Sequence, residues 1–127
     1  MREILFRGKE DSGKWFFGNL FVPDIKGRPT QICMGTSLIR IARDVIPETV
    51  GQYTGLKDKN GKKIFEGDIV LYARDEEVGQ IAYHETEAMF IVEFDTWLTD
   101  FDHTFGDELE VIGNIHDNPE LMKGSAE

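Results

Sequence analysis

The sequence predicts a mainly β fold in one small domain of 127 residues. Short apolar runs rich in β-branched and aromatic residues recur along the chain, and groups of Gly, Pro, Asn and Asp separate them. Hydrophobic residues make up 40% and charged residues 30% of the chain, which is ordinary for a globular protein that buries a core. We therefore expect a single β domain over residues 1–122 and a disordered tail over 123–127.

The N-terminal residues predict a β-hairpin. Ile4 and Phe6 share one face of a first strand, residues 10–14 form a turn, and residues 15–22 are rich in the β-formers expected of the return strand. Gly18 within the return strand indicates a bulge or a close approach of two backbones.

Three short segments connect this hairpin to the middle of the chain. Residues 30–34 favour a strand. Residues 37–46 are compatible with a strand or a short helix, and their Ile and Val content with Pro47 at the end favours a strand. Residues 47–49 predict one helical turn that begins with proline.

The second half resembles a partly closed SH3-like barrel built from about residues 64–115. Residues 58–62 predict a hairpin turn in which Asn60 and Gly61 supply positive φ values. Strands are expected at 69–73, 79–83, 89–94 and 110–115. Helical spacing of aromatics competes with turn residues over 95–108, so a loop holding one helical turn is expected there. Residues 118–122 predict a short helical turn at the C-terminus.

The net charge of −10 is unevenly distributed. Residues 1–74 hold 13 Lys and Arg against 9 Asp and Glu, whereas residues 75–127 hold one Lys against 15 Asp and Glu. Opposite charges on identical chains favour a homo-oligomer, although a fold that interleaves the halves would simply have an acidic surface. Direct binding of nucleic acid is disfavoured, because phosphate contact needs concentrated Lys and Arg.

The sequence also indicates a cytoplasmic protein. No run approaches the ~18 apolar residues of a membrane helix, and the charged N-terminus does not resemble a signal peptide, so no membrane partner is expected. Cys33 is the one cysteine, which excludes an intrachain disulfide, and its apolar neighbours predict a buried, inert thiol.

No metal or cofactor is expected from the residue spacing. The turn at 58–62 resembles the start of a calcium loop, but Lys63 and Ile69 replace the required Gly and Glu. Three groups contain ligand-type residues without a spacing that sets two imidazoles on one face, and we interpret them as surface loops. They are His84 with Glu85 and Glu87, Asp100 with Asp102 and His103, and His116 with Asp117.

No catalytic constellation is expected either, so the chain is predicted not to be an enzyme. Ser12 and Ser37 lack a G-x-S-x-G context. Glu66 and Asp68 are paired carboxylates of the kind used in acid–base chemistry, but the turn around Gly67 predicts that they cap backbone amides. The aromatics Trp15, Phe16, Phe17, Phe21 and Tyr53 allow a stacking platform for bases, yet core and hairpin packing is favoured.

Three segments carry a family resemblance. They are the opening residues 1–7 (MREILFR), the central residues 48–56 (ETVGQYTGL) continuing to 65–70 (FEGDIV), and the closing residues 110–115 (EVIGNI) with 118–121 (NPEL). In this order they resemble the YopX-like proteins of bacteriophages and prophages. The resemblance implies a mostly β fold, a phage or prophage origin and residence in the bacterial host cytoplasm. It implies no catalytic residues.

Two functions fit these observations. The first is an accessory protein that acts by protein–protein contact, as a homo-oligomer or with a host or phage protein. Gln52, Tyr53 and Thr54 are its candidate contact surface, with a turn-stabilising role as the alternative. The second is an acidic mimic of nucleic acid that binds a host DNA-binding protein, with Asp100, Asp102 and Asp107 as the candidate acidic patch.

Overall fold

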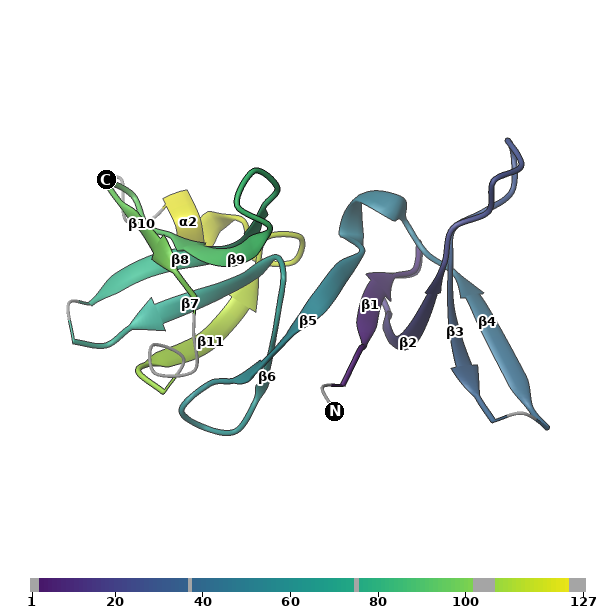
Figure 1. Ribbon diagram of the computed structural model, residues 1–127, viewed down its shortest axis with the longest axis horizontal. Helices are drawn as coiled ribbons and strands as arrows, with labels where there is room; N and C mark the ends of the chain where they lie inside the picture. Colours follow the sequence, from purple (N-terminus) through teal and green to yellow (C-terminus); the bar gives the residue numbers. More distant parts are fainter. Residues whose placement is uncertain (1–2, 37, 75, 102–106, 124–127) are drawn as a thin grey trace. The chain divides into compact units, whose positions relative to one another are not determined.

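Antiparallel strands dominate the structure, a computed structural model that describes residues 3–36, 38–74, 76–101 and 107–123 (Figure 1). The predicted mainly β class is confirmed. The elements in chain order are β1 (Phe6–Lys9), β2 (Trp15–Phe21), β3 (Gln31–Gly35), β4 (Arg40–Asp44), η1 (Pro47–Thr49), β5 (Gly51–Lys57), β6 (Lys63–Phe65), β7 (Asp68–Tyr72), β8 (Glu77–His84), β9 (Met89–Glu93), β10 (Leu98–Asp100), β11 (Leu109–Asn114) and α2 (Glu120–Lys123).

The chain divides into two compact units, Met1–Tyr53 and Thr54–Glu127. The single domain over residues 1–122 stays a prediction, and the predicted tail lies outside the described residues except for Lys123, which ends α2. Among the described residues, no helix has the length and hydrophobicity that a membrane crossing requires.

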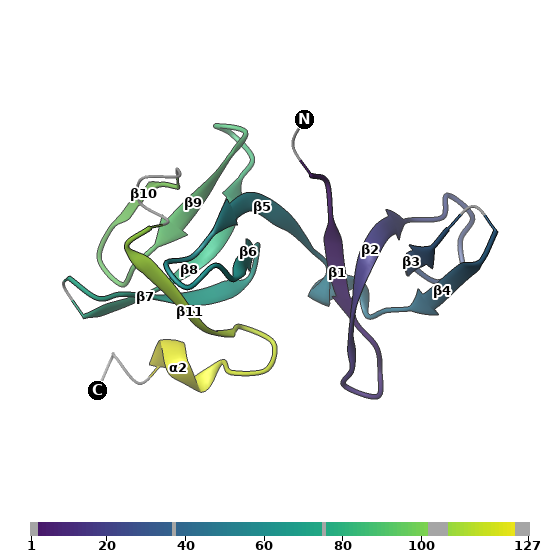
Figure 2. The same cartoon turned by 90° about the horizontal axis from the view of Figure 1, so that it is seen from below.

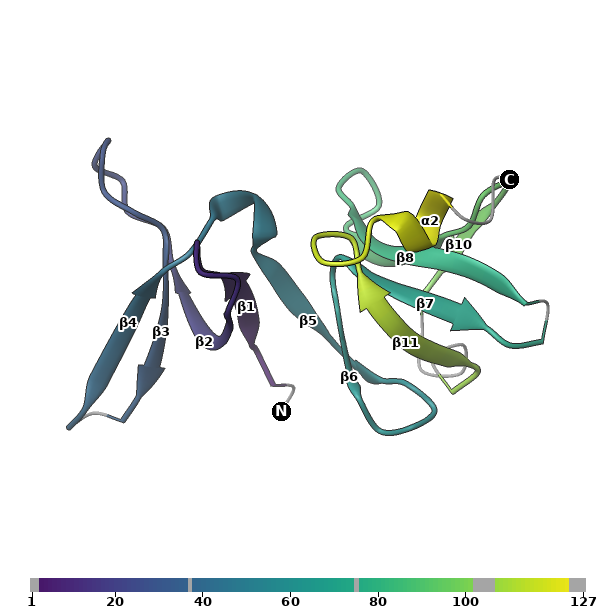
Figure 3. The ribbon, with the colours of Figure 1, turned by 180° about the vertical axis from the view of Figure 1, so that it is seen from behind.

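The first unit contains β1 to β4 and the start of β5, which belong to a six-stranded sheet with the order β4-β3-β2-β1-β5-β6, and β4 lies at its edge (Figure 3). The predicted N-terminal hairpin is confirmed, with Lys9 paired to Trp15 across β1 and β2. Gly18 is a close-approach site, as predicted, because a Cβ there would collide with the backbone oxygen of Cys33 in β3. The strand predicted at 37–46 and the helical turn at 47–49 are β4 and η1.

One side of the first unit is closed by the segment that leads into η1. Val45 packs over β1 where Gly8 leaves no room for a side chain, since a Cβ there would lie 2.9 Å from the Val45 Cβ. The Thr49 hydroxyl accepts the Lys9 N–H at 2.9 Å and donates to the Ile46 oxygen at 2.6 Å. These contacts tie η1 to the hairpin.

The second unit contains the larger core. Its five-stranded sheet has the order β10-β9-β8-β7-β11, and α2 follows β11 (Figure 2). A cluster of buried side chains forms the core of the unit, comprising Ile64, Val70, Tyr72, Ile81, Val92, Phe94 and Leu109. The sheet is open in strand order, with β10 and β11 at its two edges. Burial of these apolar side chains is the main stabilising contribution to this unit.

Two local expectations in the second unit need correction. Residues 98–100 of the loop expected at 95–108 form strand β10, whose Leu98 and Asp100 pair with β9; the expected helical turn is absent from 95–101 and 107–108, and residues 102–106 lie outside the described part. Cross-strand pairing with β9 outweighs the local aromatic spacing here. In the turn at 58–62, Gly61 has a φ of 85°, but Asn60 is not among the residues with positive φ. Gly61 therefore supplies the positive φ of this turn without Asn60.

The Asp58 carboxylate anchors this turn to the last strand. Its Oδ1 accepts the N–H groups of Asn60 and Lys62 at 2.8 and 2.9 Å. Its Oδ2 accepts the N–H of Val111 in β11 at 2.9 Å. The Lys59 N–H donates to the Leu109 oxygen at 3.0 Å, which adds a second tie to β11. Asp58 is 5% exposed, so these charge-assisted hydrogen bonds are protected from water.

These contacts set the ionisation of Asp58. Burial acts to raise the pKa of the Asp58 carboxyl, but hydrogen bonds from the N–H groups of Val111, Lys62 and Asn60, with the charge of Lys62, outweigh it. The pKa of Asp58 is therefore held below its ordinary value, and the ionised form is the one that the fold binds.

We expect Asp58→Ala to lower the free energy of unfolding by about 2–4 kcal/mol, because three backbone N–H groups lose a charged acceptor. Urea denaturation measures this through Trp97 fluorescence in a Trp15→Phe background, since the chain has two tryptophans and Trp97 reports on the second unit. Glu85→Ala is the matched control, because Glu85 is exposed and should change the free energy by less than about 0.5 kcal/mol. Equal effects of the two substitutions would contradict the assignment.

The pH dependence of stability provides a separate test of Asp58. A pKa that is lower in the folded than in the unfolded chain stabilises the fold above the unfolded value, and this contribution is lost as the pH falls through the folded pKa. We expect the stability difference between the wild type and Asp58→Asn to be largest near pH 7 and to shrink on acidification to about pH 2. Denaturation curves measured across this range would contradict the prediction if the difference stayed constant.

Candidate functional site

The predicted contact surface in the central signature consists largely of side chains engaged by the fold. The Thr54 hydroxyl donates to the Ile64 oxygen at 2.8 Å and accepts the Leu56 N–H at 3.2 Å. Tyr53 is 6% exposed, and burial, followed by the nearby Glu3 carboxylate, raises the pKa of its phenol. Gln52 is half-buried. These contacts support the turn-stabilising alternative for Thr54, and the contact surface itself stays a prediction.

One of the two paired carboxylates at the start of β7, Asp68, binds the backbone. Asp68 is 2% exposed, and its Oδ2 accepts the Phe65 N–H at 2.7 Å. Gly67 has a φ of 93°, donates its N–H to the Ile81 oxygen at 2.8 Å and accepts the Ile115 N–H at 2.9 Å. The predicted capping role is confirmed for Asp68.

The closing motif is a second hydrogen-bonded turn. The Asn114 Oδ1 accepts the N–H groups of His116 and Asp117 at 3.0 and 2.9 Å. The Asn118 Oδ1 in turn accepts the Asn114 N–H at 3.3 Å. Gly113 makes room for this arrangement, because a Cβ there would lie 2.6 Å from the Asn118 Oδ1. The motif thus sets the chain direction between β11 and α2.

The candidate acidic patch is partly described. Asp100 in β10 and Asp107 before β11 are exposed, whereas Asp102 lies outside the described residues. Other carboxylates of the second unit have local partners: Glu108 is 3.2 Å from Arg74, and Glu110 is 3.8 Å from Lys59.

A surface hollow of about 330 Å³ also lies in the second unit, lined by Glu76, Glu77, Val78, Asp95 and Thr96. Next to Thr96 in the chain, Trp97 stacks on Phe94 with 4.4 Å between ring centroids. The Trp97 Nε1 donates to the Glu77 Oε2 at 3.0 Å, which fixes one carboxylate of the hollow. The hollow is therefore acidic, and its volume lies at the lower end of the range of ligand pockets, roughly 300–1,000 Å³.

The ligand-type residues are separated in the structure. Within the ranges that the structure describes, no three His, Cys, Asp or Glu side chains gather in a group that would hold a metal ion. The His84 Nδ1 accepts the Glu87 N–H at 3.3 Å, which makes it part of the β8–β9 turn. The predicted group of Asp100, Asp102 and His103 falls mainly outside the described residues.

The aromatic side chains of β2 divide between two environments. Phe17 and Phe21 are 46% and 51% exposed, so the core part of the predicted core and hairpin packing does not hold for them. Alternation along the strand directs them to a face of the sheet that is left open. Trp15 has the Arg7 guanidinium 4.9 Å from its ring centroid, and Phe16 has that of Arg43 at 5.3 Å. Cys33 in β3 is half-buried rather than fully buried.

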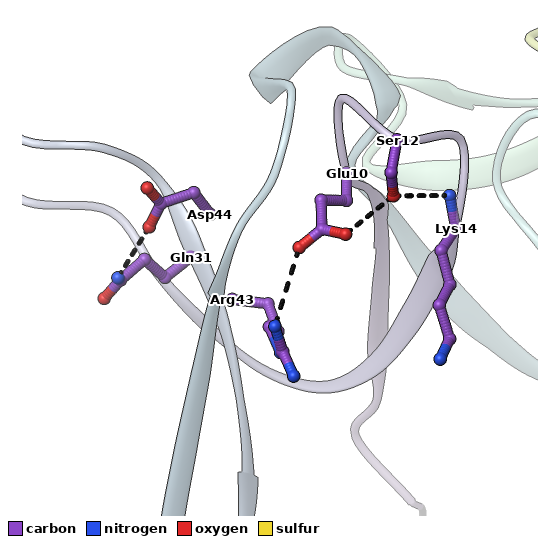
Figure 4. A network of polar contacts seen from close by, with 6 residues as sticks. All are labelled: Glu10, Ser12, Lys14, Gln31, Arg43 and Asp44. Carbon is purple, nitrogen blue, oxygen red and sulfur yellow. Dashed lines mark hydrogen bonds and ion pairs between the residues drawn. The ribbon is translucent and has the colours of Figure 1, made fainter.

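A polar network joins the β1–β2 turn to β4 (Figure 4). The Glu10 carboxylate accepts the Ser12 hydroxyl at 2.7 Å and lies 3.9 Å from the Arg43 guanidinium. Beside it, the Gln31 Nε2 donates to the Asp44 Oδ1 at 2.8 Å. The network orients β4 within its sheet, and its exposed ion pair contributes little to stability.

The sequence interpretation missed the exposure of β4 and the residues before it. All five residues of β4 are exposed, and Leu38 and Ile39 are 93% and 65% exposed. The signal that was available is the charge content of this apolar segment, which contains Arg40, Arg43 and Asp44. Charged residues within an otherwise apolar strand are typical of a sheet edge.

These features define an antiparallel β protein whose signature residues mainly bind its own backbone. The family model of the YopX protein matches residues 5–123, and the chain belongs to this family. The crystal structure of protein EF1440 from Enterococcus faecalis is similar, with 26% sequence identity, a TM-score of 0.61, and coverage of 96% of this chain and 99% of that chain. A comparison with curated proteins found no match.

We expect Gly113→Ala to lower the free energy of unfolding of the second unit by about 1–3 kcal/mol, because the new methyl group displaces the Asn118 amide. The penalty should be smaller by at least about 0.5 kcal/mol in an Asn118→Ala background, where the colliding amide is absent. A double-mutant cycle measured by urea denaturation tests this coupling. Additive effects of the two substitutions would contradict the close-approach role of Gly113.

Proposed function

We propose that this chain is a non-enzymatic accessory protein, encoded by a phage or prophage and residing in the bacterial host cytoplasm, that acts by protein–protein contact as a homo-oligomer. The observation that carries the proposal is the exposed apolar surface of the first unit. Phe17, Phe21, Leu38 and Ile39 are each between 46% and 93% exposed, and exposed apolar groups of this kind mark interaction sites.

The distribution of charge supports self-association. The first unit contains eight Lys and Arg and six Asp and Glu, whereas the second contains six and eighteen. A slightly basic unit and a strongly acidic unit on every copy give each chain a surface that attracts the other unit of a neighbouring chain.

The non-enzymatic role is supported by what Asp68, one of the two predicted paired carboxylates, and the buried Asp58 do. Asp68 is bound to the Phe65 N–H, and Asp58 to three N–H groups, so both buried carboxylates are acceptors for the backbone. A general acid or base instead needs access to a substrate proton.

An acidic mimic of nucleic acid is the alternative function. It requires a continuous row of unpaired carboxylates, whereas Glu108 and Glu110 have basic partners and Asp58 is buried. The ion pairs of Glu108 and Glu110 and the burial of Asp58 therefore favour the accessory role. Competition with DNA for a host DNA-binding protein that is weakened by Asp100→Asn with Asp107→Asn would support the mimic instead.

We expect the chain at micromolar concentration to form one defined homo-oligomer at about 50 mM salt and to dissociate in part at about 500 mM salt, because screening weakens contacts between exposed charges. Light scattering coupled to size-exclusion chromatography measures the mass under both conditions. A monomer at both salt concentrations would refute the proposed homo-oligomer. A mass distribution that grows without limit would indicate aggregation and would also refute it.

A further inference from the structure

The edge strand β4 is an unpaired hydrogen-bonding surface in the first unit. Its five residues, Arg40–Asp44, pair with β3 on one side, and it ends the strand order of the sheet. Ile41 is 45% exposed. An exposed five-residue edge without proline or a bulge is a template for adding another strand.

The pairing with β3 determines which backbone groups point outward. The Val45 N–H donates to the Thr30 oxygen at 3.0 Å, and the Thr36 N–H donates to the Ile39 oxygen at 2.7 Å. Residues on this strand alternate in direction, so Ile41 and Arg43 share the inward direction with Ile39 and Val45. The N–H and C=O groups of Arg40, Ala42 and Asp44 therefore point away from β3, toward the open edge.

We propose that β4 pairs with β4 of a second copy of this chain, antiparallel and about a two-fold axis at Ala42. In this register Ala42 lies opposite Ala42 of the other copy, and Arg40 lies opposite Asp44. Every outward N–H and C=O group of these three residues then has a partner. An isologous contact of this kind closes after two chains, so it forms a dimer rather than a fibre.

Side-chain charge selects this register. Residues opposite each other in a hydrogen-bonded antiparallel pair have Cα atoms about 5.5 Å apart, within reach of an ion pair between Arg40 and Asp44. Symmetry produces this ion pair twice. A two-fold axis at Arg40 or at Asp44 would instead place like charges opposite each other, which is unfavourable.

Within the described ranges, the contacts of the first unit leave Arg40 and one oxygen of Asp44 without a partner and so open to the intermolecular contact. The Asp44 Oδ1 is held by the Gln31 Nε2 at 2.8 Å, while its Oδ2 has no partner among the described residues (Figure 4). Arg43 is directed to Glu10 within its own unit, but Arg40 has no ion-pair partner in the part of the chain that the structure describes. Arg40 and the second Asp44 oxygen are thus available to another chain.

This inference rests on the proposed homo-oligomer and names its surface. We expect Ala42→Pro to raise the dissociation constant by about tenfold or more, because proline removes the outward N–H at the centre of the contact and leaves the inward bonds of Arg43 and Ile41 in place. Ala42→Ser is the matched control and should associate like the wild type. Trp15 fluorescence and hydrogen exchange of the β3 amides verify that the first unit is folded in both variants.

Charge reversal gives a second test that depends less on folding. R40D and D44R should each weaken self-association by about tenfold, because each puts like charges opposite each other in both halves of the contact. A mixture of the two variants should associate again as a heterodimer, since each chain then faces the opposite charge. Sedimentation velocity of the separate and mixed variants measures this recovery.

The outcomes separate this inference from the proposed function. A wild-type oligomer that survives Ala42→Pro and both reversals would overturn pairing through β4 and leave the homo-oligomer standing. A wild-type monomer would overturn both. A monomer whose β4 amides become protected by a different protein would assign this edge to that protein and overturn the self-pairing.

Discussion

The Asp58 carboxylate is the interaction on which the second unit depends. It joins a local turn to a strand that is 53 residues further along the chain, through Val111. Without this acceptor, three partly buried N–H groups would lose their charged partner, and such groups are costly to leave unsatisfied. The same carboxylate therefore fixes the turn at 58–62 and the position of β11 beside it.

Several residues of the family signature likewise form hydrogen bonds between their side chains and the backbone. Asp68 caps Phe65, Thr54 binds the Ile64 oxygen, and Asn114 with Asn118 closes the turn before α2. Side chains that bind their own backbone specify a fold without specifying a ligand. The family match over residues 5–123 is therefore consistent with a shared architecture.

Most strands could be predicted from sequence because β-branched runs and turn residues are local signals. The sequence patterns did not predict the structure where contacts between residues distant in the chain determine it. β10 forms because Leu98 and Asp100 find partners on β9, and Phe17 and Phe21 are exposed because the side of the sheet they occupy is open. Exposure of an edge depends on strand order, which β-propensity does not encode, so β4 was predicted as a strand but not as a surface; the charges within it were the one local signal of an edge.

The pairing of β11 with β7 has a consequence for synthesis of the chain. Leu109–Asn114 is the last strand of the second unit, yet it lies beside β7, which begins at Asp68. β7 therefore leaves the ribosome with one side paired by β8 and the other open until β11 follows. The second unit cannot complete its core before Leu109 is made, because Leu109 is fully buried in that core. Cotranslational folding of this unit is thus a late event, and a nascent chain stalled before β11 exposes an apolar strand to chaperones and to other chains.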